Sequence, residues 1–372
     1  MRKVEKYIVN MRKISTACRS EFMEDVNVDL FLQPKDLADA LGITVQGVHK
    51  LLKEHHIEST MANPRQRRIY PASVRQVAQL KGLPIPSGVV VVHLVKGGVG
   101  KTTLIHGLAA RASAYGCRTL MIDLDQQANL STSFGVYSRP KKDPSLLDVY
   151  VGHMNGKKVK IQDTVVKVTD FLHIIPANLT LANLDVSIVQ GTENIGNLFE
   201  SMFKPIRKDY DLIFIDCPPS LSRVTSAAHC YADKILLPVN TDRFSLDGLE
   251  LTLEHLSLLQ KKFRAKAELH VVINKFDARQ KLGFEVINEL ASEYRDMLCE
   301  AYITVSKQID NSIAANECLW NPQQGKNAAL EDFNNLLMEV FNLKTWKDQM
   351  AGRRKSVGSS SHSRKREVVA HG

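Results

Sequence analysis

Residues 89–103 read VVVVHLVKGGVGKTT, an apolar run followed at once by a glycine-rich loop that ends in a lysine and two threonines. The run over 89–95 predicts a buried strand, and the residues after the loop, roughly 102–114, predict a helix. Three glycines allow the backbone to curl so that its N–H groups point at one centre, where they can hold a triphosphate. The stretch therefore predicts a phosphate-binding loop at the positive N-terminal end of a helix.

Within this loop the side chains have distinct expected roles. Lys101 would place its ammonium on the β- and γ-phosphates, and the Thr102 hydroxyl would face a Mg²⁺ ion. The general pattern has a glycine at position 95, where this chain has Val95, and this loop instead carries a second lysine, Lys96. A solvated glycine turn is the alternative, but the preceding strand and the threonine pair argue against it. The predicted nucleotide-binding set is Lys96, Gly97, Gly98, Val99, Gly100, Lys101, Thr102 and Thr103.

Around the loop, the pattern from residue 89 to about 350 predicts an α/β fold. Apolar strands are expected at 89–95, 119–123, 172–175, 211–215, 234–239 and 269–273. They alternate with amphipathic helices, among them 248–262, 283–297 and 329–341. This alternation indicates a doubly wound, mostly parallel sheet with P-loop NTPase topology, whose phosphate site lies at the carboxyl ends of the strands.

Residues 33–82 predict a small winged helix-turn-helix domain that binds DNA. A helix opens at Pro34 and ends at Gly42, and a second helix follows with Thr44 as its expected cap. An arginine-rich turn before a third helix is typical of a wing, which would contact phosphates or the minor groove. A solvated arginine turn is the alternative. The candidate DNA contacts are Gln46, Lys50 and Lys53 on the second helix, and Arg65, Arg67 and Arg68 in the wing.

The two ends of the chain complete the domain organisation. In residues 1–32, Val4, Tyr7, Met11, Ile14 and Cys18 recur at spacings of three and four, which predicts a helix stripe for dimerisation, or for packing on its own domain. Residues 83–88, rich in proline and glycine, are the expected linker. Residues 351–372 are serine-rich and basic, which favours a disordered tail.

Charge distribution indicates a polyanionic partner. The net charge is +9, and residues 1–87 hold 14 Lys and Arg against 9 Asp and Glu, while residues 351–372 hold 6 against 1. Basic ends around a near-neutral centre suggest that the chain binds nucleic acid or acidic lipid. No C-x-x-C pair, apolar signal segment or membrane-length apolar run is present in the sequence, so a cytoplasmic location is expected.

Four segments resemble the ParA-type DNA-partition ATPases. They are KGGVGKTT at 96–103, LMIDLDQQANLSTSFG at 120–135, DLIFIDCPPS at 211–220, and LPVNTDRFSLDGLE at 237–250 followed by VVINKFDAR at 271–279. They occur in family order over roughly residues 88–345. Gln126 stands where the family usually has proline, which changes the stiffness of a turn and not its chemistry.

The resemblance implies a role for individual residues. Asp216 would hold a Mg²⁺-bound water, and Asp125 would orient the water that attacks the γ-phosphate, so Thr102, Asp125 and Asp216 form the expected metal set and Lys96, Lys101 and Asp125 the catalytic set. Lys96 would cross a dimer interface to the partner's ATP. Asn274 would read the adenine edge, and Lys307 would contact DNA without sequence preference. For both aspartates, an N-cap or turn role is the alternative.

The resemblance further implies an ATP- and Mg²⁺-dependent homodimer that coats DNA on the nucleoid, hydrolyses ATP slowly with a ParB-like partner, and represses its own operon through an operator.

Three alternative functions fit the sequence less well. A MinD-like membrane ATPase needs a C-terminal amphipathic helix, which the tail does not predict. A metal-cluster carrier needs paired cysteines, and Cys217 stands alone. A transcription regulator with a vestigial ATPase fits poorly with the complete set of loop lysines and aspartates.

Overall fold

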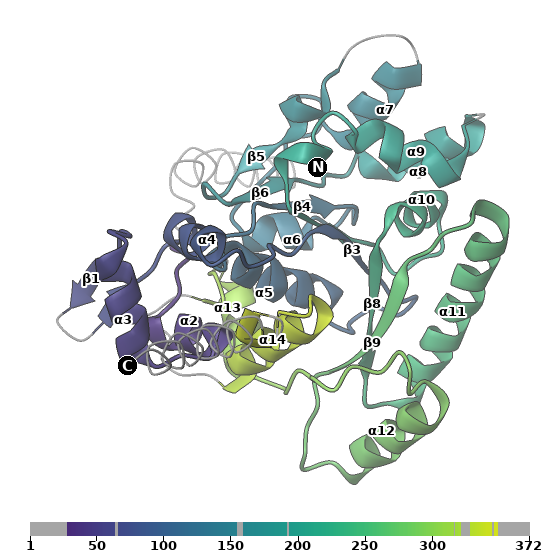
Figure 1. Ribbon diagram of the computed structural model, residues 1–372. Helices are drawn as coiled ribbons and strands as arrows, with labels where there is room; N and C mark the ends of the chain where they lie inside the picture. Colours follow the sequence, from purple (N-terminus) through teal and green to yellow (C-terminus); the bar gives the residue numbers. More distant parts are fainter. Residues whose placement is uncertain are drawn as a thin grey trace, which may run out of the picture.

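The protein's structure is a computed structural model that describes residues 28–63, 66–154, 159–191, 193–315, 317–320, 328–343 and 346–348. The stripe predicted between Val4 and Cys18, the wing residue Arg65 and the basic tail at 351–372 lie outside the described residues. Two assemblies of elements are visible, a large α/β sheet with its helices and a smaller group formed by residues 30–83, called here the N-terminal module (Figure 1).

A seven-stranded sheet forms the centre of the large part, in the order β5-β6-β4-β7-β3-β8-β9. All neighbouring pairs are parallel except β5 with β6, which are antiparallel. This confirms the predicted mostly parallel sheet, and adds the short edge strand β5, which the sequence pattern did not predict. The strands are β3 (Gly88–Val92), β4 (Thr119–Asp123), β5 (Val166–Lys167), β6 (Leu172–Ile175), β7 (Leu212–Asp216), β8 (Lys234–Asn240) and β9 (Glu268–Asn274).

Helices cover both faces of this sheet. Successive residues of a strand point to opposite faces, so each face packs against its own helices. Val90 and Val92 share one core with α5 (Lys101–Ala114) and α14 (Ala328–Val340). Val89 and Val91 share the other core with α8 (Leu181–Gln190), α9 (Ile195–Phe203), α10 (Arg223–Tyr231) and α11 (Arg243–Phe263). The remaining helices are α6 (Asn129–Ser133), α7 (Leu146–Met154), η1 (Ile161–Thr164), η2 (Arg207–Asp209), α12 (Lys281–Glu293) and α13 (Lys307–Ala314).

The N-terminal module contains three helices and a hairpin. Helices α2 (Pro34–Leu41) and α3 (Val45–Glu54) are joined by a turn in which Gly42 takes a φ of +62°, a conformation that glycine adopts without strain. The Thr44 hydroxyl caps α3 by accepting a hydrogen bond from the backbone N–H of Gly47 at 3.0 Å. The hairpin, β1 (Thr60–Asn63) and β2 (Gln66–Arg68), precedes α4 (Pro71–Leu80). The helix pair, the hairpin and the third helix follow the predicted order.

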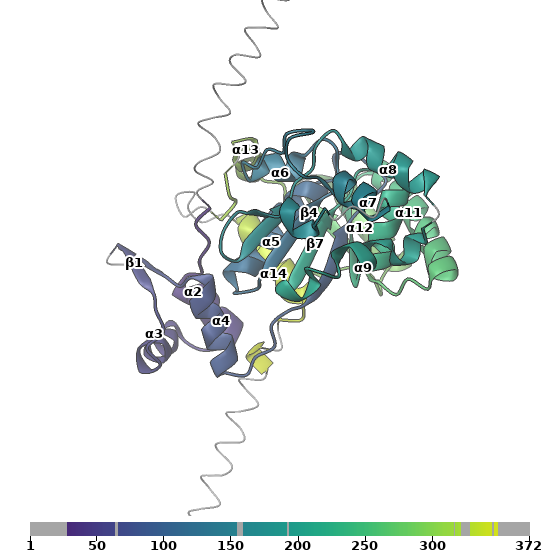
Figure 2. The ribbon, with the colours of Figure 1, turned by 90° about the horizontal axis from the view of Figure 1, so that it is seen from above.

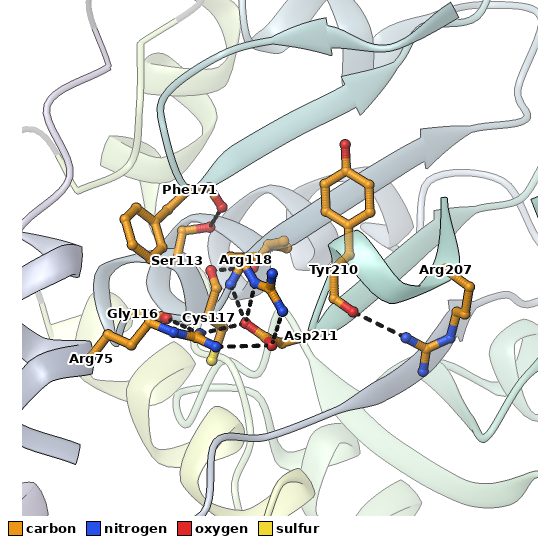
Figure 3. A network of polar contacts seen from close by, with 10 residues as sticks. Arg75, Ser113, Gly116, Cys117, Arg118, Phe171, Arg207, Tyr210 and Asp211 are labelled. Atoms are coloured by element: carbon orange, nitrogen blue, oxygen red, sulfur yellow. Dashed lines mark hydrogen bonds and ion pairs between the residues drawn. The ribbon is translucent and has the colours of Figure 1, made fainter. Parts of the chain in front are cut away.

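Ion pairs join the N-terminal module to the sheet. Arg75 on α4 binds the carboxylate of Asp211 at 2.6 Å and donates to the carbonyl of Gly116 at 2.8 Å, and Arg118 holds the same carboxylate at 3.0 Å (Figure 3). Burial alone would raise the pKa of Asp211, but the bonds from Arg75 and Arg118 more than offset it and lower the pKa. The Asp211 side chain therefore acts as a charged clamp between the two parts.

Further contacts make this junction a continuous core. Arg111, buried on α5, pairs with Asp36 of α2 at 2.9 Å. Within the expected linker, Leu83 is buried, and the carbonyl of Pro84 accepts a hydrogen bond from the Trp346 ring at 2.7 Å. The apolar residues of the module belong to the same core cluster as α5 and α14, and Figure 2 shows the module lying against that side of the molecule. Residues 83–88 are thus anchored at both ends, since Leu83 and Gly88 are buried, while Pro84 and Ser87 between them are exposed.

Substitution of Gly116 is expected to destabilise this junction. Gly116 has a φ of +85°, and a Cβ there would lie 2.8 Å from the backbone nitrogen of Arg75 and from the carbonyl oxygen of Pro71. Gly116→Ala combines left-handed strain with a backbone clash, so we expect a loss of about 3 kcal/mol in the free energy of unfolding, measured in urea. Gly97→Ala is the control, since a Cβ at Gly97 meets nothing within 4 Å. Equal effects of the two changes would contradict a tight junction.

Candidate nucleotide-binding site

The strand order brings the predicted site residues to one edge of the sheet. The loop at 93–100 leaves β3, and β7, which ends at Asp216, is the direct neighbour of β3. On the far side of β7 lies β4, whose last residue, Asp123, stands opposite Asp216 in register. Because the carboxyl ends of parallel strands share one edge, the loop and the two aspartates face the same region.

The loop has the curled backbone that the three glycines predict. Gly98 and Gly100 have φ values of +76° and +85°, and α5 begins at the next residue, Lys101. The Lys101 side chain is buried and bends back over the loop, where its Nζ donates to the carbonyl of Lys96 at 2.9 Å. Burial lowers the pKa of Lys101, while the nearby Asp216 and Asp125 oppose that shift. The loop thus presents a helix N-terminus and a poorly hydrated ammonium to one centre, which suits a polyphosphate.

The residues predicted to hold Mg²⁺ meet beside the loop. The Thr102 hydroxyl donates to Oδ2 of Asp216 at 2.7 Å. The other oxygen, Oδ1, is buried and has no hydrogen-bond partner among the described residues. Burial, together with the adjacent Asp123, raises the pKa of Asp216 well above its usual range. A buried carboxylate oxygen without a partner, next to a hydroxyl, is the donor set that a hard oxygen-seeking cation requires, so these residues fit Mg²⁺.

Asp125 and Asp123 occupy different positions at the end of β4. The strand ends at Asp123, so Asp125 lies in the following turn. Oδ1 of Asp125 accepts from the backbone N–H of Gln127 at 3.0 Å. Asp123 is fully buried and accepts from the backbone and the hydroxyl of Ser131 at 2.9 and 2.7 Å, and burial raises its pKa to about 6. The sequence-based predictions gave Asp123 no role. The two neighbouring strands β4 and β7 both end in Ile-Asp, and this shared ending is the sequence signal that marks Asp123.

Lys96 is held by the start of α11. Its Nζ lies 2.5 Å from Oδ1 of Asp242 and 3.0 Å from the hydroxyl of Ser245, with the Phe244 ring 5.7 Å away. Burial would raise the pKa of Asp242, but hydrogen bonds from Lys96 and Ser245 more than offset it and lower the pKa. Sequence reasoning missed Asp242, because the pairing joins residues 146 positions apart. Lys96 therefore lies away from the phosphate side of its own loop, tied to a carboxylate.

Asn274, the last residue of β9, contacts the loop directly. Its side-chain nitrogen donates to the carbonyl of Val99 at 2.6 Å, and the side chain is buried. Lys275 follows with a positive φ and donates to the carbonyl of Gly98 at 3.1 Å. These two bonds fix the outer strand of the sheet to the loop. In this arrangement the amide of Asn274 is engaged by the protein backbone, and its adenine contact stays a prediction.

The candidate DNA contacts fall into two groups. Gln46, Lys50 and Lys53 are exposed on α3, with Lys50 3.6 Å from Glu54, and Lys307 is exposed at the first turn of α13. The two described wing arginines are instead bound within the module. Arg67 donates to the Ser59 hydroxyl at 2.8 Å, and Arg68 pairs with Asp29 at 2.5 Å and lies over the Phe31 ring. The side chains of the first group are exposed to solvent, whereas the two arginines of the second group are bound to residues of the module.

Within the described ranges, no helix has the length and apolar character needed to cross a membrane. A glycine-rich loop at the end of the buried strand β3, followed by a helix and flanked by the neighbouring strand β7 that ends in aspartate, defines a P-loop nucleotide-binding protein. A family model described as an AAA domain matches residues 87–271. The N-terminal module lies outside that match.

Similarity to individual proteins identifies the family within the P-loop nucleotide-binding class. The sporulation initiation inhibitor protein Soj of Bacillus subtilis is 30% identical over 247 residues, which is 66% of this chain and 92% of that protein. The chromosome partitioning protein ParA of Myxococcus xanthus is 26% identical over 66% of this chain and 82% of its own length. The chain belongs to the ParA/Soj family of partition ATPases.

Solved structures agree with this fold. A putative plasmid partition protein from Borrelia burgdorferi, bound to AMPPNP, has a TM-score of 0.58 at 22% identity, covering 70% of this chain and 99% of that one. Cobyrinic acid a,c-diamide synthase from Mycobacterium smegmatis, with a bound ATP analogue and magnesium, has a TM-score of 0.54 at 26% identity, covering 62% and 91%. Related P-loop ATPases thus bind nucleotide and magnesium on this type of sheet.

Proposed function

We propose that this chain is a DNA partition ATPase. Its ATP-bound homodimer coats DNA without sequence preference, and a ParB-like protein stimulates hydrolysis and release on the nucleoid in the cytoplasm. The observation that carries the proposal is the arrangement around the loop: Lys101 curled over it, Thr102 bound to Asp216, and the extra lysine Lys96 held beside it. Membership of the ParA/Soj family supports the same activity.

Each residue then has a chemical task. Lys101 and the backbone N–H groups of the loop bind the phosphates of ATP. Thr102 and Asp216 hold Mg²⁺, which would neutralise charge on the phosphate oxygens when bound. Asp125, in the turn beside Asp216, orients the attacking water. The buried Asp123 fixes that turn, since its Oδ1 accepts from the backbone N–H of Asp125 at 3.1 Å.

Lys96 makes the activity depend on assembly. Because its ammonium is bound to Asp242 and Ser245 in a single copy, it must leave these groups to reach the phosphates of a partner's ATP. The γ-phosphate would compete with the carboxylate for this lysine. Loss of the γ-phosphate on hydrolysis returns Lys96 to Asp242 and separates the dimer, so slow, switch-like turnover is expected.

The direct test is ATP hydrolysis measured with and without random duplex DNA and a ParB-like protein. We expect slow basal hydrolysis that requires Mg²⁺ and rises when DNA and the partner are present together. Complete absence of hydrolysis under all conditions, with operator binding intact, would instead identify a transcription regulator whose ATPase is vestigial.

The N-terminal module gives the second proposed activity. We propose that residues 33–82 act as a winged helix-turn-helix domain that binds an operator and represses the chain's own operon. Gln46, Lys50 and Lys53 share the exposed side of α3 and would face the DNA. Lys307 lies on a different element and would contribute to non-specific binding. The wing arginines would add phosphate contacts, although Arg68 is also a structural partner of Asp29.

Lys50→Ala combined with Lys53→Ala should weaken operator binding and lower its salt dependence. Each lysine would neutralise one phosphate, so the slope of log K against log salt should fall by about 2. Fluorescence anisotropy over a salt series measures this slope. Lys261→Ala with Lys262→Ala, on the exposed end of α11, is the matched control and should leave the slope unchanged. An unchanged slope in the α3 variant would refute the assignment of α3 to the DNA.

A further inference from the structure

A cavity of about 510 Å³ lies at the amino-terminal edge of the sheet, opposite the edge that carries the loop at 93–100. Its lining includes Val89 near the start of β3, Asp233 directly before β8, Tyr231 at the end of α10 and Phe263 at the end of α11. Strands β3 and β8 are parallel, so their first residues lie at this same edge. The cavity is therefore separate from the candidate nucleotide-binding site.

Five cationic side chains line this cavity. They come from the end of α9, from η2 and from the residues that follow α11, and they are Lys204, Arg207, Lys208, Arg264 and Lys266. We call these five residues and the hollow between them the basic cavity. None of the five forms an ion pair with another described residue. Glu200 and Asp233 are the carboxylates in the described lining, so positive charges outnumber negative ones by five to two.

Helix dipoles account for only part of this concentration of charge. Lysines and arginines are favoured in the last turn of a helix, where they offset its negative end. Lys261 and Lys262, in the last turn of α11, fit that explanation. Arg207 and Lys208 instead belong to a 3-10 turn of three residues, and Lys266 lies three positions beyond the end of α11. These side chains are better explained by a negatively charged ligand.

Two polar groups at the wall of the basic cavity support a ligand. The Arg207 guanidinium donates to the carbonyl of Tyr210 at 3.1 Å, which fixes its direction through one of five N–H groups (Figure 3). The Tyr231 hydroxyl is buried and has no hydrogen-bond partner in the described part of the chain. Burial raises the pKa of Tyr231 to about 12, while the positive charge of Arg207 opposes this shift, so the two groups lie near each other. A ligand that reached the hydroxyl would supply the missing bond.

The chemistry of the basic cavity selects a small organic phosphate. Guanidinium and ammonium groups bind phosphate through charge-assisted hydrogen bonds. The volume of about 510 Å³ is within the range of small-molecule sites. The partly exposed Phe263 ring would stack on a base, and the carboxylates of Glu200 and Asp233 would accept hydrogen bonds from sugar hydroxyls. Two linked phosphates carry about three negative charges, which would balance the excess of lysines and arginines.

We propose that the basic cavity binds a nucleoside diphosphate, with the phosphates on its lysines and arginines and the base against Phe263. This is a second nucleotide site, and it goes beyond the proposed ATPase function. Helix α11 joins the two sites, because its N-cap Asp242 holds Lys96 and its last residue, Phe263, lines the basic cavity. A helix of 21 residues is about 31 Å long, so a ligand in one site does not contact the other.

Equilibrium dialysis of the full chain against ADP at low ionic strength tests the proposal. The wild type should bind two ADP per chain, one at the loop and one in the basic cavity. Lys204→Ala with Lys266→Ala should raise the Kd of the cavity site by ~10-fold or more, because two phosphate contacts are lost, and should leave the loop site unchanged. Both lysines are exposed, so the fold should not be disturbed. Lys141→Ala with Lys142→Ala, exposed before α7, is the matched control and should keep both sites.

Lys101→Ala separates this proposal from the ATPase proposal. It should remove the loop site and leave the cavity site. Binding of one ADP per chain that depends on Lys101 alone would overturn the second site and retain the proposed function. Binding of one ADP per chain that depends on Lys204 and Lys266 alone would support the basic cavity and reject the proposed function.

Tyr231→Phe and two competitors test the class of ligand. Removal of the hydroxyl should raise the Kd of the cavity site about 5-fold, as for one hydrogen bond, without lowering stability, since no described residue bonds to that hydroxyl. Inorganic pyrophosphate should displace ADP from the cavity only at higher concentration, because it lacks the sugar and base. Displacement by a random DNA duplex would assign the five cations to nucleic acid and overturn the proposal. An unchanged Kd in both cavity variants would also overturn it.

Discussion

Lys101→Ala should remove ATP binding, whereas Lys96→Gln should retain binding and lose hydrolysis. Lys101 is buried, bends over the curled loop and would bind the phosphates of its own ATP, so its loss should raise the Kd for ATP by roughly 100-fold, as for other charged hydrogen bonds. Lys96 points toward Asp242 and, in the proposed function, would serve a partner's nucleotide, so its removal should lower kcat on the order of 10³-fold, as for an arginine finger. Fluorescent ATP titration and phosphate release measure the two effects.

Asp242→Asn is the companion variant for Lys96. It keeps the shape of the residue but removes the charge that retains Lys96, so ATP-dependent dimerisation should become tighter and basal hydrolysis faster. Sedimentation with a non-hydrolysable ATP analogue follows the dimer. Equal loss of ATP binding in Lys101→Ala and Lys96→Gln would contradict the division between own and partner phosphates. Slower hydrolysis in Asp242→Asn would contradict a restraining role for the carboxylate.

Asp216→Asn should stop Mg²⁺-dependent hydrolysis while making the nucleotide-free protein more stable at alkaline pH. The substitution removes the carboxylate that we propose holds Mg²⁺, and we expect a fall in kcat of at least ~100-fold. It also removes a buried charge beside Asp123, with one oxygen that has no partner in the described chain. The gain in the free energy of unfolding at alkaline pH should be on the order of 2 kcal/mol, because the neutral amide avoids the cost of burying a charge that lacks a full set of partners.

The sign of the pH effect follows from the direction of the pKa shift. The folded protein raises the pKa of Asp216 well above 3.8, so it holds the proton more tightly than the unfolded chain does. Stability from this group is complete below about pH 4 and is lost as the pH rises through the raised pKa. Urea unfolding at pH 5 and pH 8 should therefore show the advantage of Asp216→Asn growing with pH. An advantage that shrinks toward pH 8 would exclude this explanation.

The sheet could be predicted from sequence because its strands are short, continuous apolar runs. The predicted strands 119–123 and 172–175 coincide with β4 and β6, and the bounds of the other predicted strands differ from the observed ones by a few residues. Edge strand β5 has only two residues, both exposed, so it carries no apolar signal. The sequence pattern predicted that this helix starts at Gly248, five residues after the actual start of α11 at Arg243. The N-cap is Asp242, and the first turn that follows it is partly charged.

The site was predictable where its residues are adjacent in sequence or end a strand. The loop, Thr102 and Asp216 follow from local pattern, and the sheet brings them together. Contacts between distant segments leave no comparable local pattern in the sequence. The Lys96–Asp242 pair and the Arg75–Asp211 clamp each join residues more than 130 positions apart. Asn274 was assigned to the base from the resemblance, whereas its bond to the Val99 carbonyl depends on how β9 approaches the loop.

The anchored segment at 83–88 bears on how the two activities can be separated experimentally. A chain truncated before Pro84 would lose α4 and the apolar residues that share a core with α5 and α14. It would also leave the buried guanidinium of Arg111 without its ion pair to Asp36, and the carboxylate of Asp211 with one arginine fewer. Removing the module thus uncovers interior surface of the enzyme itself. The N-terminal module is therefore a structural part of the ATPase. Its proposed DNA binding is better tested by point substitutions on α3 than by truncation.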